Sequence, residues 1–372
     1  MPTNIRMYNC AFGDCFNITH RENEEESHLY VDFGIHSRCG NAGNWRNVRY
    51  DDIINDIPEH ADFLLTHYHY DHYSGLLRMI SCHQKRFDNV YIPDVWGIAG
   101  SINTVTLLLL KDLLTRTVLE RGMSLISFLI SICHSNGRVF FVKRGDIIQD
   151  RYVALWPNEE CVNQASGELM QHVRDVIDIP GELVNIANRL CECMRQIHEI
   201  GFRESTKQLI QELETLENQM VELAQNITAE PHLQKKLADF KHSINIIFQN
   251  HREEDRHILF TGDAEKVRWL WDEIEQNRDG MVPFYRRYDV IKVPHHGTGG
   301  HYRNFTGITD RNSVFLIPNG RIPLWSITED YSIDANNQGS IVCCSCNDAC
   351  LARALRCNCR RRNVIPNIYI DI

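Results

Sequence analysis

Short apolar runs and turn residues alternate with helical patterns in the first part of the chain. Residues 5–35 predict two strands joined by the charged turn RENEEES, because apolar and polar positions alternate on both sides of it. The following residues predict strands at 62–65 and 89–92 and helices over 102–132 with a break at Gly122. Residues 138–142 and 152–156 are predicted to form a hairpin around the turn KRGDIIQD.

The middle of the chain has a different pattern, rich in Glu, Gln, Leu and Lys. Apolar residues recur there every three to four positions, at Leu209, Leu213, Leu216, Met220 and Leu223. This spacing predicts a helical hairpin or bundle over 167–238, broken near Pro180, Gly201 and Pro231. The bundle either packs on its own body, forms a dimerisation arm or partner-binding surface, or closes over a site as a lid.

Strand patterns return after the bundle, at 243–249, 257–260 and 289–293, with a helix over 266–276. Two of these strands, like the strand at 62–65, run directly into clusters of His, Asp and Gly. Strand ends that meet at one sheet edge are a common way for α/β proteins to build a site. Asp32 also ends a predicted strand, where it either supports such a site or only caps the strand.

Composition and charge restrict the classes of protein to which this chain could belong. The chain has 372 residues, of which 43% are hydrophobic and 24% charged, as in an ordinary globular protein. Its formal net charge of -10 does not favour general binding to nucleic acid, which is also negatively charged. The N-terminus lacks the pattern of a signal peptide, and charged residues interrupt the apolar region 105–133. We therefore expect a cytoplasmic protein without a membrane segment, whose 14 cysteines are mainly reduced thiols.

The segment LLTHYHYDHYSG, residues 64–75, carries the clearest chemistry. It places four ligand-type side chains, His67, His69, Asp71 and His72, within six residues. In an extended loop His67 and His69 point the same way, whereas Asp71 and His72 point to different sides, so one segment serves two adjacent ions. Imidazole and carboxylate ligands suit zinc, manganese or iron. The alternative is a histidine-rich surface loop without a metal.

Three motifs in order, THYHYDHYSG, LFTGDAE and IKVPHHGTGG, together resemble the metallo-β-lactamase fold family. Within it, they are most similar to the hydrolase domain of ComEC-type DNA-uptake proteins and their soluble relatives. The resemblance covers residues 5–158 and 240–320 and implies an α/β fold: a four-layer αβ/βα sandwich, here with a helical insertion. It divides the chain into a first half-domain, the insertion, a second half-domain and a Cys/Arg-rich end, at 1–158, 159–239, 240–330 and 331–372.

The resemblance also implies a dinuclear centre that holds two divalent ions, Zn²⁺ by preference with Mn²⁺ or Fe as alternatives. His67 and His69 would bind the first ion, Asp71 and His72 the second, and Asp263 would bridge them. His296 would complete the second ion and His295 would face the substrate, unless the two histidines exchange these roles. The first ion needs a third histidine, for which His242 fits better than His134 or His251.

The implied reaction is hydrolysis through a hydroxide shared by the two ions, with Asp71, Asp263 and His295 as catalytic residues. Gly297, Thr298 and Gly299 could offer N–H groups and a hydroxyl to a phosphate, or simply form a turn. The leading hypothesis is a phosphodiesterase or nuclease acting on nucleic acid or a nucleotide. The alternatives are a hydrolase of another ester, thioester or lactam, and an effector or defence component that works with a partner protein or as a homodimer through 167–238.

The C-terminal end holds a separate cysteine cluster. Its members are Cys343, Cys344, Cys346, Cys350, Cys357 and Cys359. A second, structural zinc site could use Cys344 or Cys346 with Cys350, Cys357 and Cys359; unligated thiols are the alternative.

Overall fold

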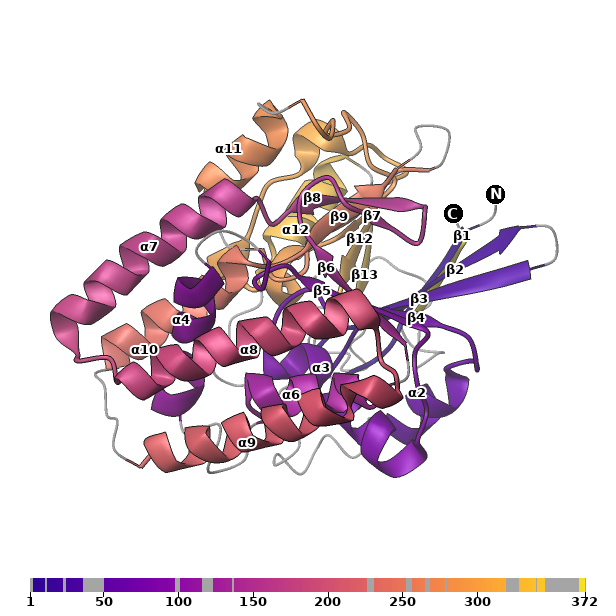
Figure 1. Ribbon diagram of the computed structural model, residues 1–372. Helices are drawn as coiled ribbons and strands as arrows, with labels where there is room; N and C mark the ends of the chain where they lie inside the picture. The colour runs from indigo at the N-terminus through magenta and orange to yellow at the C-terminus, as the bar shows by residue number, and fades with distance from the viewer. Residues whose placement is uncertain are drawn as a thin grey trace, which may run out of the picture.

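Two seven-stranded sheets form the centre of the computed structural model (Figure 1). The structure describes residues 3–10, 12–22, 25–35, 50–97, 101–115, 123–135, 137–225, 231–251, 256–264, 268–277, 280–318, 328–338, 340–344 and 368–371. The first sheet has the order β14-β1-β2-β3-β4-β5-β6. Its strands are Ile368–Asp371, Thr3–Met7, Cys15–Glu22, Glu25–Phe33, Asp62–Leu64, Asn89–Pro93 and Arg138–Val142.

The second sheet has the order β13-β12-β11-β10-β9-β8-β7. Its strands are Ile341–Cys344, Val314–Ile317, Val290–Lys292, Ile258–Phe260, Ile247–Asn250, Tyr152–Trp156 and Ile147–Ile148. Alternate residues of both sheets meet in one buried core; for example, Phe16 of β2 contacts Phe260 of β10 at a ring-centroid distance of 5.2 Å. The sheets therefore pack face to face.

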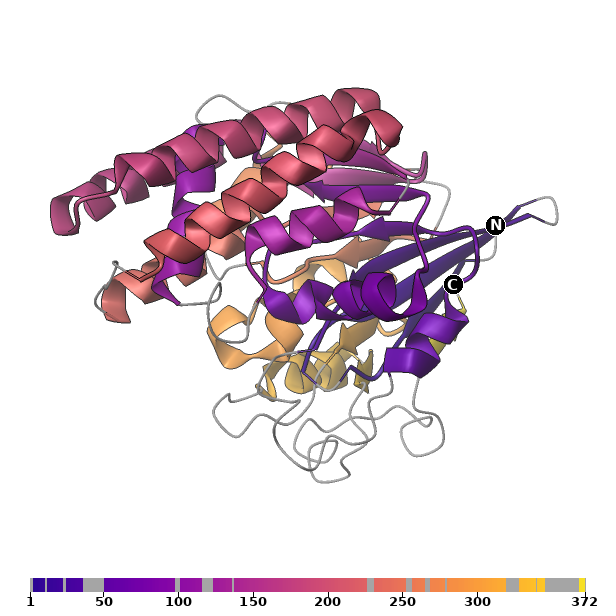
Figure 2. The same ribbon diagram turned by 60° about the horizontal axis from the view of Figure 1, so that its bottom comes forward.

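Helices cover the outer faces of the two sheets. On the first sheet lie α2 (Tyr50–Asp56), α3 (Tyr70–Arg78), α4 (Ser101–Leu114) and α6 (Leu125–Cys133), whose apolar residues share a second core with β3, β4 and β5. On the second sheet lie α11 (Arg268–Gln276) and α12 (Asp330–Gln338). Figure 2 shows this layering from below. The predicted α/β fold class, a four-layer αβ/βα sandwich, is confirmed by these layers.

Four α-helices of the described part of the chain lie between β8 and β9, which are neighbours in the second sheet. They are α7 (Glu159–Val176), α8 (Gly181–Ile200), α9 (Lys207–Leu223) and α10 (Pro231–Ser243). Leu213, Leu216 and Met220 of α9 are fully buried in the core formed with α4 and α6. The helical insertion therefore packs on its own body, although the domain boundaries given above remain a prediction. Among the described residues, no helix is long and apolar enough to cross a membrane.

Two local predictions were wrong. Residues 5–35 form three strands, because the Gly13-Asp14 break separates β1 from β2. Residues 138–142 and 152–156 do not form a hairpin: β6 pairs with β5 in the first sheet, and β8 pairs with β7 and β9 in the second. The turn between them carries the chain from one sheet to the other, which strand-like patterns on both sides of a turn cannot distinguish from a hairpin.

A third correction concerns the predicted strand at 243–249. Helix α10 continues to Ser243, and the strand β9 begins only at Ile247. His242 therefore lies in the last turn of a helix of the insertion. The predicted helix break at Gly122 lies outside the described residues.

Candidate metal centre

The first part of the centre follows β4. Thr66 and His67 come after the strand, His69 lies directly before α3, and Asp71 and His72 occupy the first turn of that helix. Asp32 at the end of β3 fixes this segment, because its carboxylate accepts hydrogen bonds from the Thr66 N–H and the Thr66 hydroxyl, each 2.7 Å long. These successive positions at the helix start point in different directions, so the His72 side chain is fully buried whereas 11% of the Asp71 side chain is exposed.

The second part is the turn Thr261-Gly262-Asp263 after β10. Asn245 holds it from beneath: its Oδ1 accepts from the Asp263 N–H at 3.0 Å and its Nδ2 donates to the Thr261 carbonyl at 2.8 Å. Gly262 has a φ of 51°, and a Cβ there would lie 1.9 Å from Asn245 Oδ1. Only glycine lets the turn approach Asn245 this closely.

The third part, Pro294-His295-His296-Gly297, follows β11. His295 and His296 both have left-handed backbones, with φ of 45° and 54°, and Gly297 follows at 76°. Two adjacent non-glycine residues in this region are strained, and such strain is found mainly at functional sites. The twisted backbone turns both imidazoles toward Asp263.

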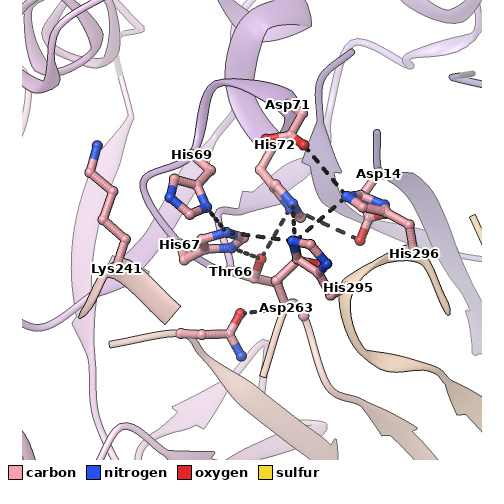
Figure 3. A network of polar contacts seen from close by, with 12 residues as sticks. Asp14, Thr66, His67, His69, Asp71, His72, Lys241, Asp263, His295 and His296 are labelled. Atoms are coloured by element: carbon pink, nitrogen blue, oxygen red, sulfur yellow. Dashed lines mark hydrogen bonds and ion pairs between the residues drawn. The ribbon is translucent and has the colours of Figure 1, made fainter. Parts of the chain in front are cut away.

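These three parts converge on one atom, Asp263 Oδ2 (Figure 3). Four imidazole Nε2 atoms surround it, those of His72 at 3.2 Å, His296 at 3.5 Å, His295 at 3.6 Å and His67 at 3.9 Å. Sets of ligand-type atoms within 4.8 Å of one another are His67/His69/His242, His67/His72/Asp263, Asp71/His72/His296 and His242/Asp263/His295. The geometry is that expected when one carboxylate lies between two cation sites.

Unpartnered nitrogen atoms test whether the residues fit metal ions. His72 Nε2, His296 Nε2 and both ring nitrogens of His242 are buried without a hydrogen-bond partner among the described residues. In His72 the other nitrogen, Nδ1, lies 2.8 Å from Asp32 Oδ2, and in His296 Nδ1 lies 2.8 Å from Asp14 Oδ1. Because a carboxylate is an acceptor, each Nδ1 carries the proton and each Nε2 is left to act as a ligand. The residues therefore fit a dinuclear metal site.

The pKa values of the histidines in the centre shift in two opposite directions. Burial lowers the pKa of His67 and His69 well below the ordinary value, and that of His242 to about 3. Burial acts in the same direction on His72 and His296, but the carboxylates beside them outweigh it, raising the pKa of His72 well above its usual range and that of His296 to about 9. A cation that takes these two ligands therefore has to displace protons.

All seven metal ligands predicted for the dinuclear centre lie in one cluster. The His242 ring lies 4.6 Å from that of His69 and 5.4 Å from that of His67, between centroids, in the place proposed for a third histidine. His296 groups with Asp71 and His72, whereas His295 groups with His242 and Asp263. His295 is only partly buried, with 18% of its side chain exposed. This matches the order of roles preferred above, although the roles themselves stay predictions.

The turn after His296 is partly used by the protein itself. The Thr298 N–H donates to the His295 carbonyl at 3.0 Å, and the Thr298 hydroxyl lies 2.6 Å from His295 Nδ1. Thr298 thus orients His295, which the sequence did not suggest. Gly297 and Gly299 stand beside it, and a phosphate-binding role for them stays a prediction. Of the proposed zinc cysteines, Cys344 ends β13, and Cys346, Cys350, Cys357 and Cys359 lie outside the described residues.

Sequence reasoning missed several residues beneath the centre. Asp14 is fully buried and lies 2.5 Å from Lys292 Nζ, which also donates to the Gly262 carbonyl at 2.5 Å and lies 3.4 Å from Asp263 Oδ1. A lysine inside the apolar strand DVIKV was a signal that could have been noticed. His301 was also missed, although it directly follows the motif PHHGTGG in the sequence. Its ring stacks on that of His295 at 3.9 Å between centroids.

The chain was also compared with known proteins. No protein-family model and no curated protein sequence matches it. Among solved structures it is similar to the metallo-β-lactamase fold protein YhfI from Bacillus subtilis, with a TM-score of 0.37 and 8% sequence identity over 92% of this chain and 95% of that chain. The fold described above follows from the strand order and the two facing sheets, independently of this low similarity.

Proposed function

We propose that this protein is a dinuclear metal-dependent hydrolase that cleaves phosphodiesters. The observation that supports this most strongly is the convergence of four imidazole nitrogens on Asp263 Oδ2, within 3.2 to 3.9 Å. Two ligand atoms of one zinc ion lie about 3–3.5 Å apart, so these distances suit cations bound beside one buried carboxylate. His67 Nε2 also lies 2.8 Å from His69 Nδ1, a direct contact that a cation held by both histidines would replace.

The residues divide between two ions. His67, His69 and His242 would hold the first, and Asp71, His72 and His296 would hold the second, with Asp263 between them. When bound, two divalent ions stabilise the charge on attacking and leaving oxygens and lower the pKa of water. We prefer Zn²⁺ because the set is rich in imidazole, with Mn²⁺ or Fe as alternatives.

The protein's own groups would supply orientation and proton transfer. Asp71 and His295 have 11% and 18% of their side chains exposed, whereas His67, His72 and His296 are fully buried. Asp71 and His295 therefore face the direction from which substrate arrives. Asp71 would accept a proton from the attacking water, and His295, held by Thr298, would contact the phosphate or the leaving group.

The charge of the protein favours a small substrate over a long polyanionic strand. A cavity of about 720 Å³ lies between α7, α10 and α11, and Ser243, the neighbour of His242, is one of its lining residues. Three carboxylates line it, from Glu168, Asp239 and Glu273, against the basic side chains of His172 and Lys236. These lining residues include no predicted ligand of the centre, so the argument against a long polyanionic strand rests on the overall net charge of -10. A cyclic nucleotide or short single strand fits better, in keeping with a nuclease-type role like that of the ComEC-type proteins.

The test combines metal analysis with a substrate panel. The protein loaded with Zn²⁺ or Mn²⁺ should hold two ions per chain and hydrolyse bis(4-nitrophenyl) phosphate, a cyclic nucleotide or short single-stranded DNA or RNA. Asp263→Asn should lower this activity roughly 10²-fold or more. Asp62→Asn is the matched control, because Asp62 is a buried aspartate of β4 that bonds Asn89 and Gln149 instead of the centre.

Two results would contradict the proposal. Absence of bound metal would refute the metal centre. Hydrolysis of a lactam such as nitrocefin, an ester or a thioester, with no phosphodiester cleaved, would establish the alternative hydrolase.

A further inference from the structure

The two halves of the metal centre are supported by different parts of the fold. Around the second ion, His72 is held by Asp32 and His296 by Asp14, and Asp14 is held by Lys292. These supporting residues belong to the two sheets or their ends. Neither nitrogen of His242 has a hydrogen-bond partner among the described residues, so another contact must hold the first-ion side.

Lys241, the residue before His242, makes that contact. Its Nζ donates to the carbonyl of Tyr68 at 3.2 Å, and Tyr68 stands between His67 and His69 in the chain. The same Nζ lies 3.2 Å from Asp112 Oδ1 of α4. One ammonium group therefore links the segment carrying two first-ion histidines to the helix carrying the third.

Asp112 extends this link into the helical layer. Its other oxygen, Oδ2, accepts a hydrogen bond from the Leu125 N–H at the start of α6, at 2.8 Å. Lys241 and Asp112 are both buried, with 7% and 2% of their surface exposed. A buried ammonium that loses its partner is strongly disfavoured, so the pair defines how α10, α4, α6 and the histidine segment fit together.

Figure 3 shows the same division in space, with His69 and Lys241 on one side of the cluster and Asp14 and His296 on the other. A pair with a purely general role in stability would support both ion sites equally. Among the described residues, Lys241 Nζ contacts Tyr68, between His67 and His69, and Asp112 of α4, neither of which supports His72 or His296.

We propose that Lys241, paired with Asp112, is a positioning residue for the first ion alone, and that the helical layer thereby controls occupancy of one of the two sites. This inference rests on the metal centre proposed above. If Lys241 has this role, the helices between β8 and β9 do more than pack on the domain, because α10 positions a part of the metal site.

Metal content separates this role from general stability. Wild type, Lys241→Met, Asp112→Asn and His242→Ala are saturated with Zn²⁺, desalted and measured by elemental analysis. We expect two ions per chain in wild type and one in Lys241→Met and His242→Ala. In Asp112→Asn, we expect an affinity for one ion that is about 10- to 100-fold weaker, the usual effect of losing a residue that orients a ligand. Lys241→Arg, which keeps the charge, should restore part of the loss.

Lys85→Met is the control. Lys85 also donates from Nζ to two backbone carbonyls, those of Ile54 at 2.6 Å and Ile57 at 2.5 Å, but away from the centre. This variant should keep two ions. The absorption spectrum of the Co²⁺-substituted protein gives a second readout, since Lys241→Met and His242→Ala should lose the same band.

The possible outcomes distinguish failure of the proposed metal centre from failure of the proposed role of Lys241. If wild type binds no metal, the metal centre itself is refuted. If wild type binds two ions and Lys241→Met also binds two with unchanged affinity, only the role of Lys241 is refuted. Loss of both ions in Lys241→Met, with the circular-dichroism spectrum of the folded protein retained, would equally overturn it, because the effect would not be confined to the first site.

Discussion

Asp32 offers a quantitative test of the second ion site, because its carboxylate holds both His72 and the backbone that leads to it. Three donors meet its two oxygens: the Thr66 N–H, the Thr66 hydroxyl and the His72 Nδ1–H, at 2.7, 2.7 and 2.8 Å. In Asp32→Asn one oxygen becomes an NH₂ group of the same size. At least one buried donor then faces another donor and loses its partner.

The number of donors that lose their partner sets the expected losses in stability and in metal affinity. One unsatisfied buried donor costs about 1–3 kcal/mol, so the free energy of unfolding of the metal-free protein should fall by that amount in a urea titration. Loss of the residue that orients His72 should weaken one metal affinity about 10- to 100-fold, or about 1.4–2.8 kcal/mol. Calorimetric titration with Zn²⁺ should show one weakened site and one unchanged site.

The control is again Asp62→Asn, at a buried aspartate on the neighbouring strand whose partners lie outside the centre. It should leave both metal affinities unchanged. Equal weakening of both sites in Asp32→Asn, or no change in either, would refute the assignment of Asp32 to His72 and the second ion.

Two further substitutions test the parts beneath the centre. Gly262→Ala should destabilise the protein by about 2–4 kcal/mol, from a left-handed backbone and displacement of Asn245, as measured by urea unfolding. Gly280→Ala, at a φ of 65° with nothing within 4 Å, should show the backbone cost of about 1–2 kcal/mol alone, and an equal loss at both would contradict the steric account. Lys292→Met should cost about 3–5 kcal/mol because it removes the buried ammonium beside Asp14 and Asp263 and leaves only imidazoles such as His72 and His296 next to them; a change below about 1 kcal/mol in thermal or urea unfolding would show that the ammonium is dispensable.

The centre was predictable where its ligands are close in sequence or follow strands. His67, His69, Asp71 and His72 share one short segment, and Asp263 and His296 each follow an apolar run, so strand ends alone suggested that they meet. The supporting residues were not predictable in this way. Asp14 contacts Lys292 across 278 positions of the chain, and no local pattern marks two residues as partners when the contact is made by the fold.

The fold was predicted better than its connections. Short apolar runs located β3, β5, β6, β8 and β10, because buried strands are apolar at most positions whatever their partners. The pairing of β6 and β8 was wrong because both a hairpin and a crossing between sheets contain a turn between two apolar strands. The end of α10 was misplaced because SINIIFQ is apolar enough to continue a strand backward, and only the tertiary packing of Phe240 and Ile244 makes the chain helical up to Ser243.

The position of the centre between the sheets has a consequence for folding. His67, His69, Asp71 and His72 follow a strand of the first sheet, whereas Asp263 and His296 follow strands of the second. Any ion held there is a cross-link between the two halves of the molecule that forms only after both have folded. Each ion adds stability by mass action, about 2.7 kcal/mol when its free concentration is 100 times its dissociation constant. The melting temperature of this protein should therefore serve as a gauge of the free metal around it.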